Sequence, residues 1–144
     1  MIRRMEGKDI PAILELGKQL HAKIGDLPEV DEQGCKMLLA RALCHKKHLV
    51  LVHERDEQIV GLLFGVIEEM WFSKALHATD VIFYSTHAGG AFMLRRFVRW
   101  AQSMGATEID MAVSSGIDVP LSSRMFERAG FKNMGSIFRF RGNK

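Results

Sequence analysis

Two consecutive glycines, Gly89 and Gly90, stand directly before residues 91–104, a segment with the pattern of an amphipathic helix. The first turn of a helix has N–H groups without partners and carries a partial positive charge. Glycines let the backbone curl so that several of these N–H groups converge on one anion. Phosphate or pyrophosphate suits such a loop best, and His87, Arg95 and Arg96 are placed to add positive charge.

Taken alone, a Gly-Gly pair before a helix is more often an ordinary tight turn. The loop lacks the Lys-Ser/Thr ending of a P-loop and the G-x-G-x-x-G spacing of a dinucleotide-binding loop. The elements predicted on either side of the loop favour an anion site over an ordinary turn. Asp80 to Tyr84 reads as a strand, residues 91–104 as a helix that ends at Gly105, and residues 107–113 as a second strand. Two strands joined in this way are parallel, with a right-handed crossover.

The rest of the chain supplies strands and helices that surround this unit. The predicted elements are a strand over residues 1–5, a helix over 10–23 capped by Asp9, a helix capped by Asp31, a hairpin of residues 49–52 and 59–67 turning at Asp56-Glu57, a helix from Asp118 to Ala129, and a last strand from Met134 to Phe140. The inner stripe of the second helix is expected to hold Cys35, Leu38, Leu39, Ala42 and Leu43. We therefore expect an α/β fold, one domain over residues 1–144, as a sandwich around a mixed, mostly antiparallel sheet.

Composition sets limits on the class of protein. The chain has 144 residues, 47% of them hydrophobic and 26% charged, which is ordinary for one globular domain. A net charge of +3 and a pI near 9.0 suit an anionic ligand, although the basic residues are spread along the chain. The N-terminus has no signal-peptide pattern, and no apolar run approaches the roughly 20 residues of a membrane span. We expect a cytoplasmic protein.

Cys35 and Cys44 lie nine positions apart in a predicted helix, which separates them by about 14 Å, too far for a disulfide. We interpret them as two buried thiols, and no His or Cys cluster has the spacing of zinc ligands, so no metal is predicted. The consecutive side chains of Met70, Trp71 and Phe72 favour a loop folded back on the core, with a lid or an interface as the alternative.

Thr86-His87-Ala88-Gly89-Gly90-Ala91-Phe92-Met93-Leu94 resembles the Gln/Arg-x-x-Gly-x-Gly/Ala loop, followed by Leu, of the GNAT superfamily of N-acyltransferases. Residues 125–131, Met-Phe-Glu-Arg-Ala-Gly-Phe, are similar to that family's Leu-Tyr-Glu-Lys-x-Gly-Phe segment. The hairpin of residues 49–67 and the strand of residues 107–113 occur in the family's order. The Gly-Gly form of the loop, with Ser115-Gly116-Ile117 after the next strand, looks most like a bacterial and phage-associated branch.

The resemblance implies transfer of an acetyl or short acyl group from acetyl-CoA to a primary amine of a small molecule, a peptide N-terminus or a lysine. It also implies a three-layer sandwich with a splayed central strand pair, and dimers are common in the family. The pantetheine arm would lie along Phe83, Tyr84 and Ser85. The other contacts to the cofactor would come from His87, Ala88, Gly89, Gly90, Ala91, Phe92 and Arg95.

Three residues depart from the family's pattern. Thr86 replaces Gln or Arg, and Ala88 stands where the branch often has Arg, so the pyrophosphate would depend mainly on backbone N–H groups. Phe126 occupies the position of a Tyr proposed to protonate the departing thiolate. General acid catalysis is typically worth about 10²–10⁴-fold, so a slower enzyme is expected. Tyr84 is a substitute acid, although it equally suits a packed strand residue.

The acceptor amine must also lose a proton. Glu68, Glu69 and Asp80 are the acidic candidates for that role, and each also suits a solvated charge at a strand end. Two other functions stay open. One is a non-catalytic CoA-binding module, favoured by Phe126. The other is nucleic-acid binding, suggested by the pI and by the helical spacing of Arg95, Arg96 and Arg99, which equally fits a solvated face.

Overall fold

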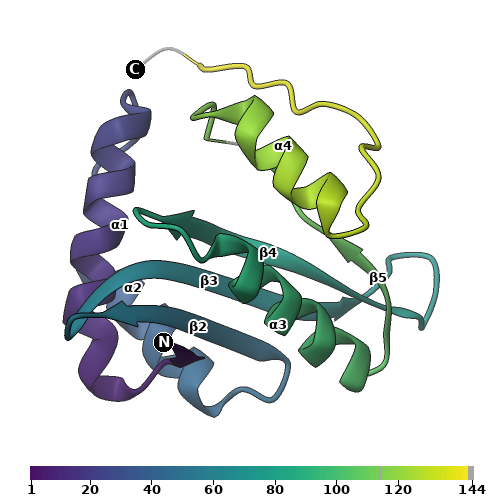
Figure 1. The fold of residues 1–144 in the computed structure, drawn as a ribbon, viewed down its shortest axis with the longest axis horizontal. Helices are drawn as coiled ribbons and strands as arrows, with labels where there is room; N and C mark the ends of the chain where they lie inside the picture. The colour runs from purple at the N-terminus through teal and green to yellow at the C-terminus, as the bar shows by residue number, and fades with distance from the viewer. Residues whose placement is uncertain (114, 143–144) are drawn as a thin grey trace.

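Five strands form one sheet in the order β1-β2-β3-β4-β5 (Figure 1). The computed structural model describes residues 1–113 and 115–142. The elements are β1 Ile2–Arg4, a 3₁₀ turn Gly7–Asp9, α1 Ile10–Ile24, α2 Glu32–Cys44, β2 His48–Arg55, β3 Gln58–Glu69, β4 Leu76–Ser85, α3 Gly90–Ser103, β5 Ala106–Asp110 and α4 Val119–Arg128. The pairs from β1 to β4 are antiparallel and β4–β5 is parallel, which confirms the predicted mixed sheet.

The β2–β3 hairpin turns where the sequence predicts. Arg55 pairs with Gln58, so Asp56 and Glu57 form a two-residue loop. Both loop residues have positive φ, 51° and 62°. This backbone matches the right-handed twist of the flanking strands, so the hairpin closes tightly.

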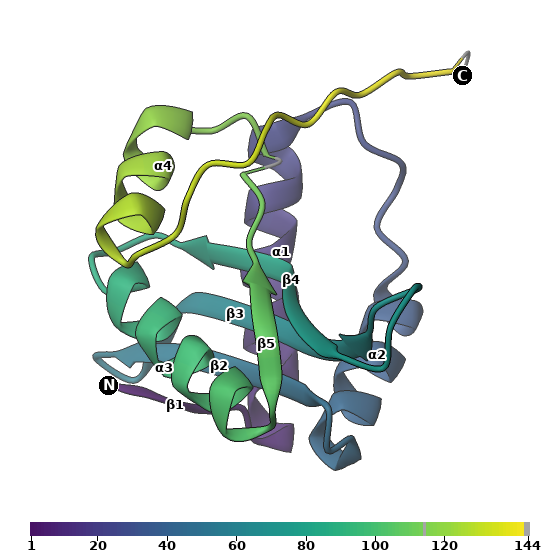
Figure 2. The ribbon, with the colours of Figure 1, turned by 90° about the vertical axis from the view of Figure 1, so that its right-hand side faces the viewer.

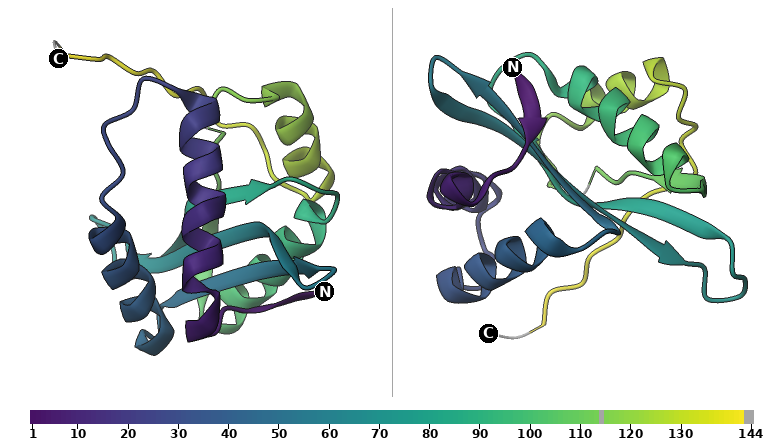
Figure 3. Two further views of the ribbon diagram at one scale, coloured as in Figure 1. Left: turned by 90° about the vertical axis from the view of Figure 1, so that its left-hand side faces the viewer. Right: turned by 90° about the horizontal axis from the view of Figure 1, so that it is seen from below.

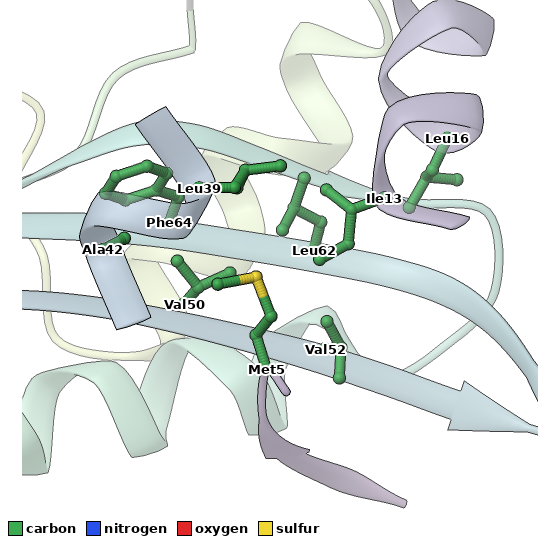
Figure 4. Packing of buried hydrophobic residues seen from close by; sticks show 9 residues of the cluster. All are labelled: Met5, Ile13, Leu16, Leu39, Ala42, Val50, Val52, Leu62 and Phe64. Atoms are coloured by element: carbon green, nitrogen blue, oxygen red, sulfur yellow. The ribbon is translucent and has the colours of Figure 1, made fainter. Parts of the chain in front are cut away.

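Helices cover both faces of the sheet, which confirms the three-layer sandwich (Figure 3). On one face, α1 and α2 pack Ile13, Leu16, Leu39 and Ala42 against β2 and β3 (Figure 4). Each large aliphatic side chain buried in this way contributes about 1.5–3 kcal/mol. Of the stripe predicted on α2, only Leu39 and Ala42 are buried, whereas Leu38 and Leu43 are exposed.

On the other face, α3 buries Met93, Phe97 and Ala101 against the sheet. Gly65 on β3 allows this close approach, because a Cβ there would lie 2.3 Å from Cε2 of Phe97. The helix stops at Gly105, whose φ of 92° suits glycine. The chain then enters β5, so the predicted strand–helix–strand crossover is confirmed.

The structure corrects the sequence prediction at the C-terminus. Residues 134–140 form no strand, because no strand edge among the described residues pairs with them. β5 is also shorter than predicted and ends at Asp110. Conversely, β4 begins at Leu76 rather than Asp80, because Leu76 pairs with Glu69 at the end of a longer β3.

Two further expectations are wrong. Cys44 is exposed and Cys35 is half-buried, so they are not two buried thiols, although both are free. Trp71 and Phe72 do not fold back on the core, since they are 95% and 68% exposed. The two rings stack edge to face on each other in the β3–β4 turn, with their centroids 5.2 Å apart. No helix in the described residues is long and apolar enough to cross a membrane.

Candidate active site

The strands β4 and β5 separate halfway along β4. Their parallel pairing ends at Thr79 and Asp110, whereas β4 continues to Ser85 and, among the described residues, pairs there with β3 alone. Figure 2 shows β5 diverging from β4. The β4 edge from Asp80 to Ser85 is therefore open on the side that faces away from β3. An open strand edge offers backbone N–H and C=O groups to an extended ligand.

The register of β4 shifts where the strands separate. Phe64 pairs with Ile82 and Gly65 pairs with Asp80, which leaves Val81 as an extra residue on β4. Such a bulge bends the strand and changes which face the following side chains occupy. Accordingly, Ala78 and Phe83 pack on the α3 face, whereas Ile82 and Tyr84 pack on the α1–α2 face.

The Gly-Gly loop directly follows the open edge. The N–H groups of Phe92 and Met93 donate to the backbone oxygen of Gly89, at 3.1 and 3.2 Å, and begin α3. Among the described residues, the N–H groups of residues 88–91 have no hydrogen-bond acceptor. No acidic side chain lies between Ser85 and Arg95. The loop and the first turn of α3 therefore form a cradle for an anion.

His53, on β2, lies directly beneath this loop. A Cβ on Gly89 would stand 2.7 Å from Cε1 and 2.8 Å from Nδ1 of the His53 ring. Gly89 also has a φ of 142°, a backbone region that favours glycine. The buried Nδ1 of His53 has no partner among the described residues, and burial lowers the pKa of this imidazole. His53 is not among the site residues predicted from the sequence, because only the fold places β2 under the loop.

Side chains before the cradle fix its shape. The hydroxyl of Ser85 donates to the backbone oxygen of His87 at 2.6 Å. Thr86 donates to the backbone oxygen of Val60 through both its N–H and its hydroxyl, at 2.9 and 3.0 Å. Thr86 therefore ties the loop to β3, and does not stand in for the Gln or Arg of the family pattern.

The three residues predicted to add positive charge occupy different positions. His87 is exposed, and its Nδ1 lies 2.9 Å from the hydroxyl oxygen of Thr86. Arg95 stacks on the ring of Phe92, with its guanidinium carbon 5.5 Å from the ring centroid. Arg96 donates to the backbone oxygen of Ile2 at 2.5 Å, so it does not extend a free basic face with Arg95 and Arg99.

Phe126 lies beside the open strand. Its buried ring contacts Phe83 on β4 and Phe131 after α4, with centroids 6.2 and 5.7 Å apart. A Cβ on Gly90 would lie 3.5 Å from Cζ of the same Phe83 ring. The α4 segment with the family-like pattern is thus next to the cradle and to β4.

Tyr84 points to the opposite face of the sheet. Its ring packs on the α1–α2 core, and Nζ of Lys23 lies 5.4 Å from its centroid. The buried hydroxyl has no hydrogen-bond partner among the described residues. Tyr84 was expected to supply the acid that is missing at Phe126. The structure instead places the two side chains on opposite faces of the sheet.

Asp80 lies at the point of separation itself. Its Oδ1 accepts a hydrogen bond from the N–H of Ala112 at 3.3 Å, across the gap between β4 and the chain that follows β5. Burial raises the pKa of Asp80, although this hydrogen bond opposes the shift. A carboxylate with a raised pKa beside an open strand edge is a candidate for a general base, as the sequence analysis expected of Asp80.

Glu68 and Glu69 do not join this arrangement. They pair with His77 and Leu76 at the start of β4, and both are exposed. The register places Gly65, not a glutamate, opposite Asp80. Among the described residues no group of three or more His, Cys, Asp or Glu side chains is arranged to hold a metal ion.

The cradle and the open edge fit the two ends of a CoA thioester. A pyrophosphate would accept hydrogen bonds from residues 88–91, and the pantetheine amides would pair with β4 between Asp80 and Ser85. Such a ligand is a donor substrate, so these residues need only bind and orient it.

The fold is shared with solved acetyltransferases. Glucosamine-6-phosphate N-acetyltransferase from Arabidopsis thaliana matches with a TM-score of 0.78 and 16% identity, over 99% of this chain and 98% of that one. An acetyltransferase from Clostridium acetobutylicum, solved with acetyl-CoA, has a TM-score of 0.75 and 17% identity, over 98% and 95%. An aminoglycoside 6′-N-acetyltransferase from Acinetobacter haemolyticus has a TM-score of 0.72 and 18% identity, over 100% and 99%.

No family model and no curated protein matches the sequence. The chain therefore has the fold of GNAT acetyltransferases, as its sequence motifs led us to expect. The narrower resemblance to a bacterial and phage-associated branch stays a prediction.

Proposed function

We propose that this protein is an N-acetyltransferase that moves an acetyl or short acyl group from acyl-CoA to a primary amine. The observation that carries the proposal is the continuity of two features along one segment. The open edge of β4 runs directly into a loop whose N–H groups, at residues 88–91, lack acceptors in the part of the chain that the structure describes. The CoA molecule has the same order, because its extended amide chain is joined end to end to a pyrophosphate.

In the proposed reaction, a neutral amine attacks the thioester carbonyl carbon. The C–N bond forms as the C–S bond breaks, and the electron pair leaves on sulfur as the CoA thiolate. Backbone N–H groups on the open edge of β4 would stabilise the negative charge that develops on the carbonyl oxygen. Asp80, poised by burial at the edge, would accept the proton that the amine loses.

The proposed reaction lacks an evident side chain to protonate the leaving thiolate. Phe126 has no hydroxyl to donate, and Tyr84 lies on the other face of the sheet. A simple thiol has a pKa of about 8.5, so its thiolate leaves fairly easily near neutral pH. We therefore propose a slow enzyme rather than an inactive one.

The acceptor is proposed only as a class. Two of the similar structures are named for acetylation of an aminoglycoside and of glucosamine-6-phosphate, both amines. A primary amine on a small polar molecule is accordingly the first class to screen, followed by peptide N-termini and lysine side chains.

Thermal unfolding with added acetyl-CoA tests the binding part of the proposal. A ligand at about 100 times its Kd stabilises by roughly 2.7 kcal/mol, which corresponds to a rise in Tm of several degrees for a chain of this size. We expect that rise with acetyl-CoA and with CoA, but not with ATP. If millimolar acetyl-CoA leaves the Tm unchanged, the proposal is wrong.

The main alternative is a CoA-binding module without turnover, which the lack of a hydroxyl at Phe126 favours. Release of free CoA thiol, followed with a thiol reagent across an amine panel, separates the two. Cys35 and Cys44 are free thiols, so each rate is corrected with a sample that lacks amine. A rise in Tm with no amine-dependent thiol release would favour the binding module.

A further inference from the structure

The floor of the anion cradle is an imidazole ring. His53 follows Leu49 and Leu51 at every second position of β2, on the face of the sheet that α3 covers, and those two leucines are buried. Glycines leave room for the ring on two sides. A Cβ on Gly89 would stand 2.7 Å from Cε1 of His53, and a Cβ on Gly61, its partner on β3, would stand 3.1 Å from Cβ of His53. The chain therefore places a titratable ring where the loop comes closest to the sheet.

The ring nitrogen that faces the loop has no partner. Nδ1 of His53 lies 2.8 Å from the Cβ position of Gly89, whereas Nε2 lies 3.5 Å from it. This Nδ1 is buried and makes no hydrogen bond to any residue that the structure describes. Buried polar atoms are nearly always paired, so an unpaired one at a candidate binding site calls for an explanation. A proton on Nδ1 would place a positive charge directly beneath the cradle.

In the free protein the surroundings oppose such a proton. Burial has the largest effect and lowers the pKa of His53. The cations that lower it further are the α-amino group of Met1, Arg55 on β2 and His87 in the loop. Arg96, on α3, adds another positive charge on this face and donates to the backbone of β1. The ring is therefore neutral in the free protein near pH 7.

The carboxylates of the neighbouring elements are engaged or lie elsewhere. Glu54, the next residue on β2, accepts a hydrogen bond from Nε of Arg3. The two acidic residues of the hairpin turn, at positions 56–57, are exposed. The loop and α3 together, over residues 86–103, contain no acidic residue. The negative charge that would stabilise a proton on His53 therefore has to come from a ligand.

We propose that His53 takes up a proton when the pyrophosphate of the donor binds in the cradle, so that the protein binds acyl-CoA more tightly as the pH falls. This inference rests on the proposed function, because it concerns the same cradle. A bound pyrophosphate brings negative charge to a ring that otherwise faces cations, and an opposite charge favours the protonated form. Because linkage is reciprocal, a ligand that raises the pKa of His53 also binds the protonated protein more tightly.

The range of pH over which protons are taken up follows from the two states of the ring. Below the pKa of the free protein His53 is already protonated, and above the pKa of the bound protein it stays neutral. Uptake therefore peaks between these two values, of which the free one is lowered from the ordinary value near 6.5. A tenfold preference for the protonated form corresponds to a pKa difference of about one, and to uptake of about half a proton at the peak.

Isothermal titration at about pH 6, in two buffers of different ionisation enthalpy, measures the protons taken up as a ligand binds. The probe is 3′-dephospho-CoA, which keeps the pyrophosphate but lacks the 3′-phosphate, a group whose own second pKa of about 6 would add to the signal. We expect uptake of about half a proton per bound ligand. The Kd should rise about tenfold between about pH 5 and pH 8.

Two failures of this titration have different meanings. Binding of 3′-dephospho-CoA without proton uptake overturns the inference about His53 and leaves the proposed function standing. If neither 3′-dephospho-CoA nor CoA binds at millimolar concentration, the proposed function is wrong and the inference falls with it.

Two substitutions on β2 test whether His53 is the group that takes up the proton. His53→Gln keeps a polar side chain that does not titrate, so proton uptake should vanish. His48→Gln is the matched control, because His48 also has a buried, unpaired Nδ1 and a pKa lowered by burial. It lies five residues away, about 16 Å along the strand, so its variant should keep the uptake of the wild type. Uptake that persists in His53→Gln, or is lost in His48→Gln, would contradict the proposal.

An NMR titration of the wild type tests the same point even if His53→Gln fails to fold. The Cε1–H resonances of the six histidines are followed against pH with and without 3′-dephospho-CoA. The pKa of His53 should rise by about one on binding, which is the tenfold preference expressed as a pKa. His87 is exposed beside the same loop and is the rival proton acceptor. A larger rise at His87 than at His53 would overturn the proposal.

Discussion

Oδ1 of Asp80 lies 3.3 Å from the backbone nitrogen of Ala112, and this hydrogen bond spans the gap that opens between β4 and β5. The carboxylate is partly buried there, and burial raises its pKa. Burial therefore disfavours the ionised form that a general base must adopt. Such a cost in stability is expected at a residue with the role that we propose for Asp80.

The substitution Asp80→Asn tests that role. If Asp80 is the general base, kcat should fall by about 10²–10⁴-fold, whereas acetyl-CoA binding should stay unchanged. Asn keeps an acceptor for the N–H of Ala112, so the fold should be retained. The control is Asp110→Asn, an exposed carboxylate on the neighbouring strand, which should leave kcat unchanged. An Asp80→Asn enzyme with wild-type kcat would contradict the assignment.

The same substitution has a predicted effect on stability. The pKa of Asp80 is raised in the folded state. The side chain therefore contributes fully to the free energy of unfolding at low pH, and this contribution is lost as the pH rises through the folded pKa. Asn does not ionise, so the variant Asp80→Asn does not lose stability as the pH rises. Its Tm should therefore exceed that of the wild type at pH 7. The difference should shrink toward pH 3, where the wild-type carboxyl is protonated. A Tm difference that does not vary between these pH values would argue against a buried charge at Asp80.

The substitution Gly89→Ala should abolish acetyl-CoA binding. The new Cβ would stand 2.7 Å from Cε1 of His53, and the φ of 142° is strained for alanine. The loop must shift, which turns the N–H groups of residues 88–91 away from the anion. Isothermal titration should show at least a tenfold increase in the Kd of acetyl-CoA.

A matched control separates this effect from general backbone strain. Gly105 also has a positive φ, 92°, but lies at the other end of α3. Gly105→Ala should lower the Tm and leave the Kd of acetyl-CoA unchanged. Equal losses of binding in both variants would mean that the cradle has no specific role.

The substitution Phe126→Tyr should accelerate the reaction. Phe126 packs against Phe83 on the open strand, so a hydroxyl at its ring para position enters the region beside β4. If it protonates the departing thiolate, kcat should rise by about tenfold or more. The matched control is Phe131→Tyr in the same aromatic cluster, with no expected gain. Equal rates for wild type and Phe126→Tyr would show that thiolate protonation does not limit the rate.

The ion pair of Arg3 and Asp9 is expected to make stability depend on pH in the acid range. Asp9 is predicted by sequence to cap α1, but its carboxylate instead accepts two hydrogen bonds from Arg3, at 2.7 and 2.9 Å, and one from the N–H of Glu6. The hydrogen bonds from Arg3 lower the pKa of Asp9. Asp9→Asn should reduce the free energy of unfolding at pH 7 by about 1.5–3 kcal/mol, since the guanidinium of Arg3 loses one of its two carboxylate partners and keeps Glu54.

The pH dependence of this loss has a definite sign. A lowered pKa in the folded state means that the contribution of Asp9 is present above the unfolded pKa near 3.8 and is lost as the pH falls through the lower folded value. Urea unfolding should therefore show the wild type and Asp9→Asn converging as the pH falls from the unfolded pKa near 3.8 through the lowered folded pKa. Glu15→Gln, which removes only an exposed pair with Lys18, should change stability by less than about 1 kcal/mol at any pH. Parallel pH profiles for wild type and Asp9→Asn would contradict the prediction.

Much of the fold is readable from local patterns. The apolar face of residues 91–104, the stop at Gly105 and the turn at Asp56-Glu57 depend on interactions between near neighbours, and the structure confirms each of them. The strand predicted over residues 134–140 fails for the converse reason. A strand exists only when another strand pairs with it, and alternation in one segment does not reveal whether a partner is present.

The sequence by itself determined that a Gly-Gly loop opens a helix between two parallel strands, because loop, helix start and crossover follow from residue types within about 30 positions. Only the tertiary structure decided which distant groups meet that loop. It placed His53 under Gly89 and Asp80 at the gap between strands, and it left Glu69 at the far end of β4. These relationships depend on strand order, register and a bulge at Val81, which arise from packing across the whole sheet and not from any local pattern.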